Sequence, residues 1–202
     1  MSELDRALND ISTIRRQVAE STQFRGYGPV TLAGTGILAI AAAIMQWQWF
    51  PHPERQITAY VWIWIVTAML SAALIGTEMF ARTRRIHFGL ADEMLRMAVE
   101  QFLPSLVAGA LITITLVRFV PGSIWMLPGL WQVISALGIL SSCRFLPQPM
   151  IVVGTWYLLT GLVSLSLADA RALSPLGMGF SYAVGQFLMA GILLLSQKGG
   201  KA

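Results

Sequence analysis

The sequence predicts an all-α membrane protein, a polytopic bundle of six transmembrane helices preceded by an amphipathic cytoplasmic helix. Of its 202 residues, 55% are hydrophobic and 12% are charged, and its mean hydropathy is +0.65. A soluble domain carries about 25% charged residues, so this chain has too little polar surface to cover a water-soluble globule. Its apolar residues also gather in six stretches near the ~20 residues that a helix needs to cross a membrane. Each stretch should be helical because lipid offers no partner for backbone N–H and C=O groups.

The six stretches form one predicted transmembrane domain, residues 28–197. The third is short and contains Pro104, so we leave open whether it crosses fully or is kinked. Proline and glycine punctuate the connections, which are too short to hold a further domain. The predicted spans are residues 29–47, 57–77, 102–117, 122–142, 149–168 and 176–196.

The distribution of Lys and Arg predicts that both termini are cytoplasmic. With six spans, eleven of these residues fall on one side and three on the other, and cytoplasmic loops carry the excess. Without the third span Arg144, Lys198 and Lys201 would face outward and the bias would weaken, so it favours six. The same rule explains the net charge of +4 without nucleic acid as a partner. The eleven are Arg6, Arg15, Arg16, Arg25, Arg82, Arg84, Arg85, Arg96, Arg144, Lys198 and Lys201; the three are Arg55, Arg118 and Arg171.

Aromatic residues cluster near the predicted outer ends of the spans, where an interfacial belt would hold them at the headgroup level. We interpret them as membrane anchors, although they could also build a ligand cage. They are Trp47, Trp49, Phe50, Tyr60, Trp62, Trp64 and Trp125.

Residues 1–27 form the predicted amphipathic cytoplasmic helix. Leu4, Ile11 and Val18 recur every seven residues, and charged side chains occupy the opposite face. Three interpretations stay open: the helix lies on the membrane surface, pairs with residues 81–101 or a second copy of the chain, or docks a partner protein.

Residues 81–101 form a basic and amphipathic cytoplasmic connection. Arg82, Arg84 and Arg85 stand together at its start and are candidate contacts for the anionic headgroups of the inner leaflet. A regulatory lipid or nucleotide-phosphate site is the alternative. Glu78 precedes Arg82 by four residues, which predicts a local ion pair at the membrane boundary.

The spans carry no ionisable residue at mid-depth, where a proton-coupled transporter normally has one. The motifs of serine hydrolases, zinc proteases and nucleotide-binding domains are not found. We therefore predict no enzymatic activity, no catalytic residue, no metal site and no cofactor. A membrane enzyme would become credible only if His87, Arg84 and Glu78 converged on a cleft facing the cytoplasm.

Uncharged polar residues do occur at mid-depth. Ladders of small residues, such as Thr35, Ala39 and Ala43, predict close helix packing with hydroxyl groups bonded across helices. Gln132 and Gln186 belong to this packing, or they line a polar cavity for a small neutral solute.

Several segments resemble a group of uncharacterised bacterial inner-membrane proteins with six helices. The segments are IRRQVAEST, LPGLWQVISALGILSSCRFLP, WYLLTGLVSL and MGFSYAVGQFLMAGILL. Genes of that group often accompany winged-helix regulators, so the resemblance implies a regulated role in the bacterial envelope. It implies no chemistry and no site residues.

We therefore expect a multi-pass protein of the bacterial cytoplasmic (inner) membrane, acting as a non-enzymatic regulatory or accessory component of an envelope system. Its partners would be the lipid bilayer and either a second copy or another membrane or cytoplasmic protein. The alternative is a small transporter or permease subunit for a neutral or lipid-like solute.

Overall fold

The computed structural model describes residues 28–50, 52–86, 91–143 and 148–199. Within these ranges all regular structure is helical, in six α-helices and two short 3-10 helices. The elements are α2 (Pro29–Trp49), α3 (Ile57–Ile86), α4 (Ala91–Phe119), η1 (Pro121–Met126), α5 (Leu127–Ser142), α6 (Met150–Ser166), η2 (Ala170–Leu173) and α7 (Pro175–Gly199). The predicted amphipathic helix of residues 1–27 lies outside the described residues.

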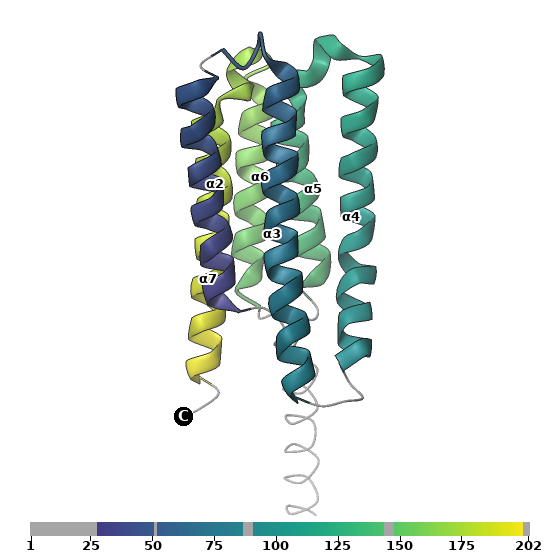
Figure 1. Cartoon of the computed structure of the whole chain (residues 1–202), viewed down its shortest axis with the longest axis vertical. Coiled ribbons are helices and arrows are strands. Elements are labelled where there is room, and N and C mark those ends of the chain that lie inside the picture. The colour runs from purple at the N-terminus through teal and green to yellow at the C-terminus, as the bar shows by residue number, and fades with distance from the viewer. Residues whose placement is uncertain (1–27, 51, 87–90, 144–147, 200–202) are drawn as a thin grey trace, which may run out of the picture.

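The α-helices stand side by side in one bundle (Figure 1). Packing is most extensive within two pairs, α2 with α7 and α5 with α6. α3 packs mainly on α2, and α4 stands at one side of the bundle, where it contacts α5 most. The first and last described helices therefore lie against each other, which closes the bundle.

Four segments are long and apolar enough to cross a membrane: Pro29–Trp49, Ile57–Ala81, Pro121–Ser142 and Pro175–Ser196. The apolar parts of α4 and α6, Leu103–Phe119 and Met150–Ser166, have 17 residues each. At 1.5 Å per residue these parts are about 25 Å long, at the lower end of the range for a membrane span.

Each of the six predicted stretches coincides with a helix, but the boundaries differ. α3 continues to Ile86 and α4 begins at Ala91, so the predicted connection 81–101 is largely helical. α4 also passes through Pro104 without interruption. The fifth stretch ends at Ser166, two residues before the predicted end, because Ala168 adopts a left-handed backbone with φ 54°.

The predicted fourth span is divided into two elements. Its first turns form the 3-10 helix η1, and the α-helix α5 begins only at Leu127. Pro128 has no backbone N–H to donate to Ile124, so the α-helical hydrogen-bond ladder cannot extend continuously across this point. The Leu127 N–H instead bonds the Ile124 carbonyl in the 3-10 pattern.

Glycine permits the close approach of α2 and α7. A Cβ atom on Gly179 would overlap the Cβ atom of Ala43 and lie 3.2 Å from the Ala39 carbonyl oxygen. Ala39 and Ala43 are buried together with Thr35. The predicted small-residue ladder of α2 therefore does form a helix interface, and its partner on α7 is Gly179.

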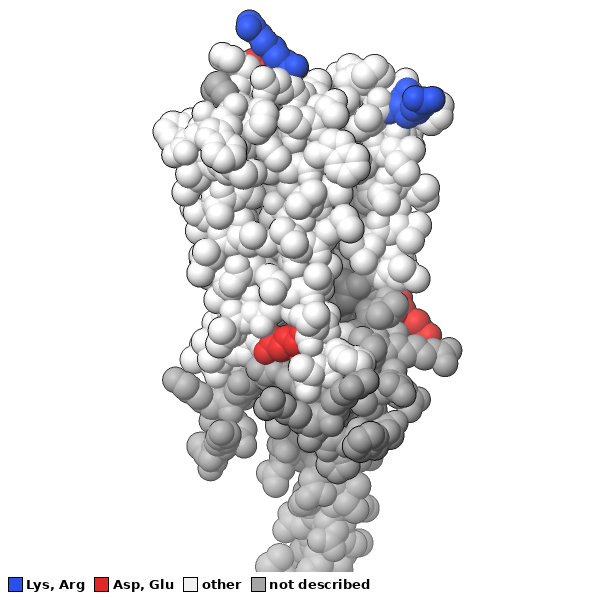
Figure 2. Space-filling model, viewed as in Figure 1, with Lys and Arg blue, Asp and Glu red and all other residues white. Residues whose placement is uncertain are grey.

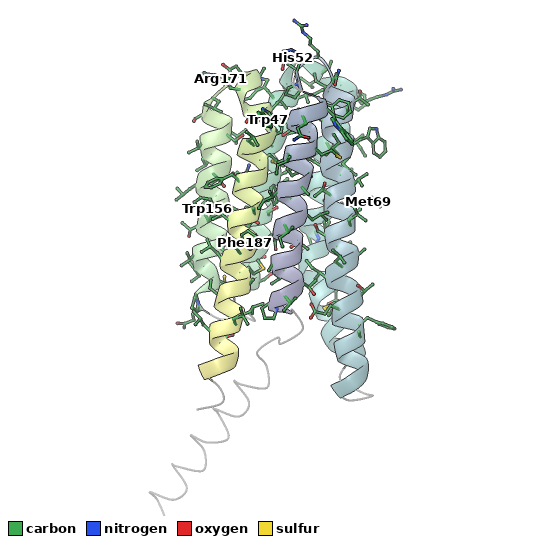
Figure 3. The ribbon with its side chains drawn as sticks, turned by 60° about the vertical axis from the view of Figure 1, so that its left-hand side comes forward. Trp47, His52, Met69, Trp156, Arg171 and Phe187 are labelled. Carbon is green, nitrogen blue, oxygen red and sulfur yellow. The ribbon has the colours of Figure 1, made fainter. Side chains whose placement is uncertain are left out.

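The charged side chains of the described residues lie towards the two ends of the bundle. On the visible face, Figure 2 shows basic side chains and an acidic one at one end, acidic side chains towards the opposite end, and uncharged atoms between them. His52 and Arg171 mark the end at which the basic side chains lie (Figure 3). We call this end of the bundle the α2–α3 connection end. α3 finishes at the opposite end.

Candidate functional site

The interior of the bundle contains a set of neutral polar side chains, which we call the polar core. Gln132 is 2% exposed, and its amide nitrogen lies 3.7 Å from the sulfur of Met178. Gln186 contacts the Tyr157 hydroxyl. The polar core comprises Gln46, Tyr60, Trp64, Gln132, Ser135, Tyr157, Met178, Tyr182 and Gln186.

Four aromatic rings connect α3, α7 and α6 through the polar core. Tyr60 and Trp64 have ring centroids 6.5 Å apart, Trp64 and Tyr182 6.4 Å, and Tyr182 and Tyr157 5.3 Å. Trp64 and Tyr182 are inclined by only 29° and stack on each other. The rings form a continuous contact from the first turn of α3 to the middle of α6.

The burial of Tyr60 and Trp64 corrects the predicted aromatic belt. Tyr60 is fully buried and Trp64 is 5% exposed, so neither ring anchors the chain at a headgroup surface. Trp62, which lies between them, is exposed, as are Trp47 and Trp49. Positions i and i+4 share a helix face and i+2 does not, so the spacing places Tyr60 and Trp64 on one face and Trp62 on another without showing which face is buried.

Besides the contact of Gln132 with Met178, aromatic side chains take part in the hydrogen bonds between helices in the polar core and beside it. The Trp131 indole donates to the Thr113 hydroxyl (2.9 Å), and the Tyr157 hydroxyl donates to the Tyr182 carbonyl (3.3 Å). The small hydroxyl residues mostly bond within their own helix, which differs from the prediction. Thr35, for example, donates to the Leu32 carbonyl at 2.8 Å.

Six buried polar atoms have no hydrogen-bond partner among the described residues. A buried amide without a partner costs about 1–3 kcal/mol by protein mutational data, so these atoms mark the places in the bundle where a bound molecule would find hydrogen-bond partners. They are Gln46 Oε1 and Nε2, Tyr60 OH, Trp64 Nε1, Gln132 Oε1 and Gln186 Oε1.

Gln132 and Gln186, which the sequence grouped as one candidate cavity, lie at different depths. The contact of Gln132 on α7 is Met178, which precedes Gln186 by eight residues, or about 12 Å along the helix. Gln186 lies instead against α2, where a Cβ atom on Gly36 would be 3.3 Å from its Cβ atom. The two amides are therefore parts of separate layers of the polar core.

The polar-core residues that sequence reasoning missed are Gln46 on α2, Tyr157 on α6, and Met178 and Tyr182 on α7. Gln46 is fully buried three residues after Ala43, on the face that packs on α7. Gln46 lies three residues after Ala43 and seven after Ala39. This spacing, which can be read from the sequence, places the three residues on one helix face.

Arg82, Arg84 and Arg85 lie in the last two turns of α3, beyond the apolar segment that ends at Ala81. Their side chains, like those of Arg96 and His87, lie outside the description, so the predicted lipid contact and the predicted ion pair with Glu78 stay predictions. The carboxylate of Glu78 itself packs against Gly28 at the start of α2. A carboxylate at this position suits the positive end of the helix dipole.

At the opposite end, Asp169 caps η2 and forms an ion pair with Arg171. The Arg171 guanidinium donates to both carboxylate oxygens, at 3.0 and 2.8 Å, and its backbone N–H donates to Oδ1 at 2.8 Å. These bonds hold the pKa of Asp169 below its usual value. Both side chains are exposed, so this ion pair stabilises the connection between α6 and α7 and is not part of the polar core.

The chain shows no similarity to known proteins that would assign a role to these residues. No family model matches it, and neither the search of curated proteins nor the search of solved structures finds a similar chain.

Proposed function

We propose that the chain is a six-span protein of the bacterial inner membrane with both termini in the cytoplasm. Four segments meet the length and hydropathy of a span. α4 and α6 stand beside them in the same bundle (Figure 1). Glu100 and Arg118 are 18 residues apart on α4, about 27 Å, with only uncharged residues between them. This spacing supports a full crossing by α4.

We propose further that the protein is a non-enzymatic accessory or regulatory component of an envelope system. The observation that carries this proposal is that α3 and α4 continue beyond their apolar segments. α3 extends five residues beyond Ala81, and α4 begins twelve residues before Leu103. We call residues 82–86 and 91–102 the helical extension.

The helical extension gives a partner two adjacent helices outside the hydrocarbon core. Arg82, Arg84 and Arg85 lie on it, beside the cytoplasmic headgroups in the proposed topology. Anionic lipids attract such basic segments by about 1 kcal/mol for each Arg near the surface. The helical extension is thus suited to bind an anionic lipid of the inner leaflet and a cytoplasmic protein at the same time.

Site-specific photo-crosslinking in native cells tests the accessory role. A photoreactive residue at Met94 in the helical extension should give one reproducible protein adduct. The matched control is Leu111, which is exposed on the apolar part of the same helix and should give none. The absence of an adduct at Met94, or solute transport by proteoliposomes that contain only this protein, would contradict the proposal.

A second candidate function is a small permease subunit for a neutral solute. It is favoured by the unpartnered amide and hydroxyl atoms of the polar core, which extend from the α2–α3 connection end to the level of Gln186. Flux of a neutral solute into proteoliposomes, reduced by Gln186→Leu, would support it. Flux unchanged by this substitution would count against it.

A further inference from the structure

Four side chains of the polar core are at least nine-tenths buried, and each has a polar atom without a hydrogen-bond partner. Gln46 and Tyr60 are fully buried, Gln132 is 2% exposed and Trp64 is 5% exposed. Their unpartnered atoms come from α2, α3 and α5. We call this set the outer polar layer, because it lies in the half of the bundle near the α2–α3 connection.

Packing contacts place the outer polar layer in one region. Tyr60 and Trp64 belong to the same buried cluster as Ala43 and Met178. The amide of Gln132 reaches Met178, and Gln46 follows Ala43 by one turn on the buried face of α2.

The register of α2 and α3 brings Gln46 to the depth of Tyr60. Gln46 lies three residues before the end of α2, and Tyr60 lies three residues after the start of α3. Because these antiparallel helices are joined by residues 50–56 alone, residues equally distant from the connection lie at similar depth. Gln46 and Tyr60 therefore lie at similar depth, and Gln132 reaches the same cluster through Met178.

The inventory of these atoms defines a ligand chemistry. Gln46 Oε1 and Gln132 Oε1 accept hydrogen bonds, whereas Gln46 Nε2 and Trp64 Nε1 donate them. The Tyr60 hydroxyl can do either. The described charged residues lie at the ends of the apolar segments and not within this layer, so a charged ligand would have no counter-ion among them.

We propose that the outer polar layer binds a small neutral alcohol or polyol. A hydroxyl group donates and accepts at the same atom, which matches the mixed donors and acceptors of the layer. The aromatic faces of Trp64 and Tyr60 would contact the carbon atoms of the ligand. Gln46 lies one turn from the end of α2, so entry would be from the α2–α3 connection end.

The proposal does not depend on the accessory role, because it concerns binding and requires neither a partner nor transport. It requires only that the described helices form the bundle. Loss of the crosslinked partner would leave it unaffected, and the failure of binding would leave the accessory role unaffected.

Saturation-transfer NMR on the full chain in nanodiscs tests the proposal, with glycerol as the probe. Gln46→Leu should weaken glycerol binding about tenfold, the loss of roughly one hydrogen bond. Gln48→Leu is the matched control, since Gln48 is exposed on the same helix and its substitution should change nothing. Gln46→Leu should also unfold at the same or a higher temperature without glycerol, because it removes unpartnered buried polar atoms.

Gln132→Leu is the second variant and should weaken glycerol binding in the same way. It tests the proposal if Gln46→Leu does not fold. Equal binding by wild type and both buried variants would overturn the proposal, as would the absence of a glycerol signal in the wild-type protein. Saturation by methylammonium or urea in place of glycerol would overturn the assigned ligand class.

Discussion

Among individual residues, glycine permits close helix packing where α2 meets α7. None of the described glycines has a positive φ, so their value lies in the missing side chain and not in a turn conformation. Gly179 and Gly191 both lie on α7, but a Cβ atom at Gly191 meets nothing within 4 Å. Alanine substitutions at these two positions therefore distinguish the effect of close helix packing from the effect of helix propensity.

Gly179→Ala should destabilise the bundle by about 1–3 kcal/mol, because its Cβ atom must push α2 and α7 apart. Gly191→Ala should stabilise it by about 0.5–1 kcal/mol, because alanine loses less conformational entropy in a helix than glycine. Thermal unfolding of both variants in one detergent measures the difference. Equal shifts would show that α2 and α7 do not pack as described.

Ala168 is the one described non-glycine residue with a left-handed backbone. Such a conformation costs a residue with a Cβ atom roughly 1–2 kcal/mol. Ala168→Gly should therefore raise the stability by about 1 kcal/mol, whereas Ala168→Val should lower it because a β-branched residue tolerates positive φ poorly. A lower melting temperature for Ala168→Gly would contradict the backbone assigned to this corner.

The sequence predicted burial less well than it predicted helices. Tyr60 and Trp64 look like belt residues when only their distance from a span end is considered, and both are buried. The direction of a side chain depends on which helix faces are covered, and this requires the tertiary arrangement. Gln132, which the sequence placed at mid-depth among neutral polar residues, is buried.

Among the secondary-structure elements, α4 differs most from the sequence-based expectation. The proline rule favours a break at Pro104, yet α4 extends from Ala91 to Phe119. A proline removes one hydrogen bond and kinks or breaks an interior helix at a cost of about 3 kcal/mol or more, and transmembrane helices tolerate this where neighbouring groups satisfy the backbone. The sequence predicted residues 81–101 as a basic and amphipathic connection outside the spans, and the structure shows that α3 and α4 continue into this segment.

The short element η2 should respond to acid through its cap. Arg171 lowers the pKa of Asp169, so the stabilisation is present above the usual carboxylate pKa of about 3.9 and is lost as the pH falls through the lower folded-state value. The melting temperature of Asp169→Asn should fall slightly below that of wild type at pH 7, and the difference should shrink below about pH 4. In an Arg171→Gln background the pH dependence should be smaller but still present, because the backbone N–H of residue 171 still donates to Asp169 Oδ1; an undiminished pH dependence would assign it to another group.

For the whole molecule, the helical bundle itself followed from composition. Six apolar stretches predicted six helices, and the structure confirms an all-helical bundle in its described part. The number of crossings is a separate question. If α4 and α6 did not cross, Arg118 and Arg144 would exchange sides and the division of Lys and Arg would still be eleven to three. The positive-inside rule thus cannot distinguish six spans from four.

Cysteine labelling at two connections tests the six-span arrangement most directly. In a Cys143→Ala background, Gly122→Cys places a thiol after α4, and Gln148→Cys places one before α6; both native residues are exposed. In cells with a permeabilised outer membrane, a maleimide that cannot cross the inner membrane should label Gly122→Cys and the reference Glu54→Cys. It should label Gln148→Cys only after the inner membrane is opened. Labelling of Gln148→Cys with protection of Gly122→Cys would contradict the six-span account and establish four crossings.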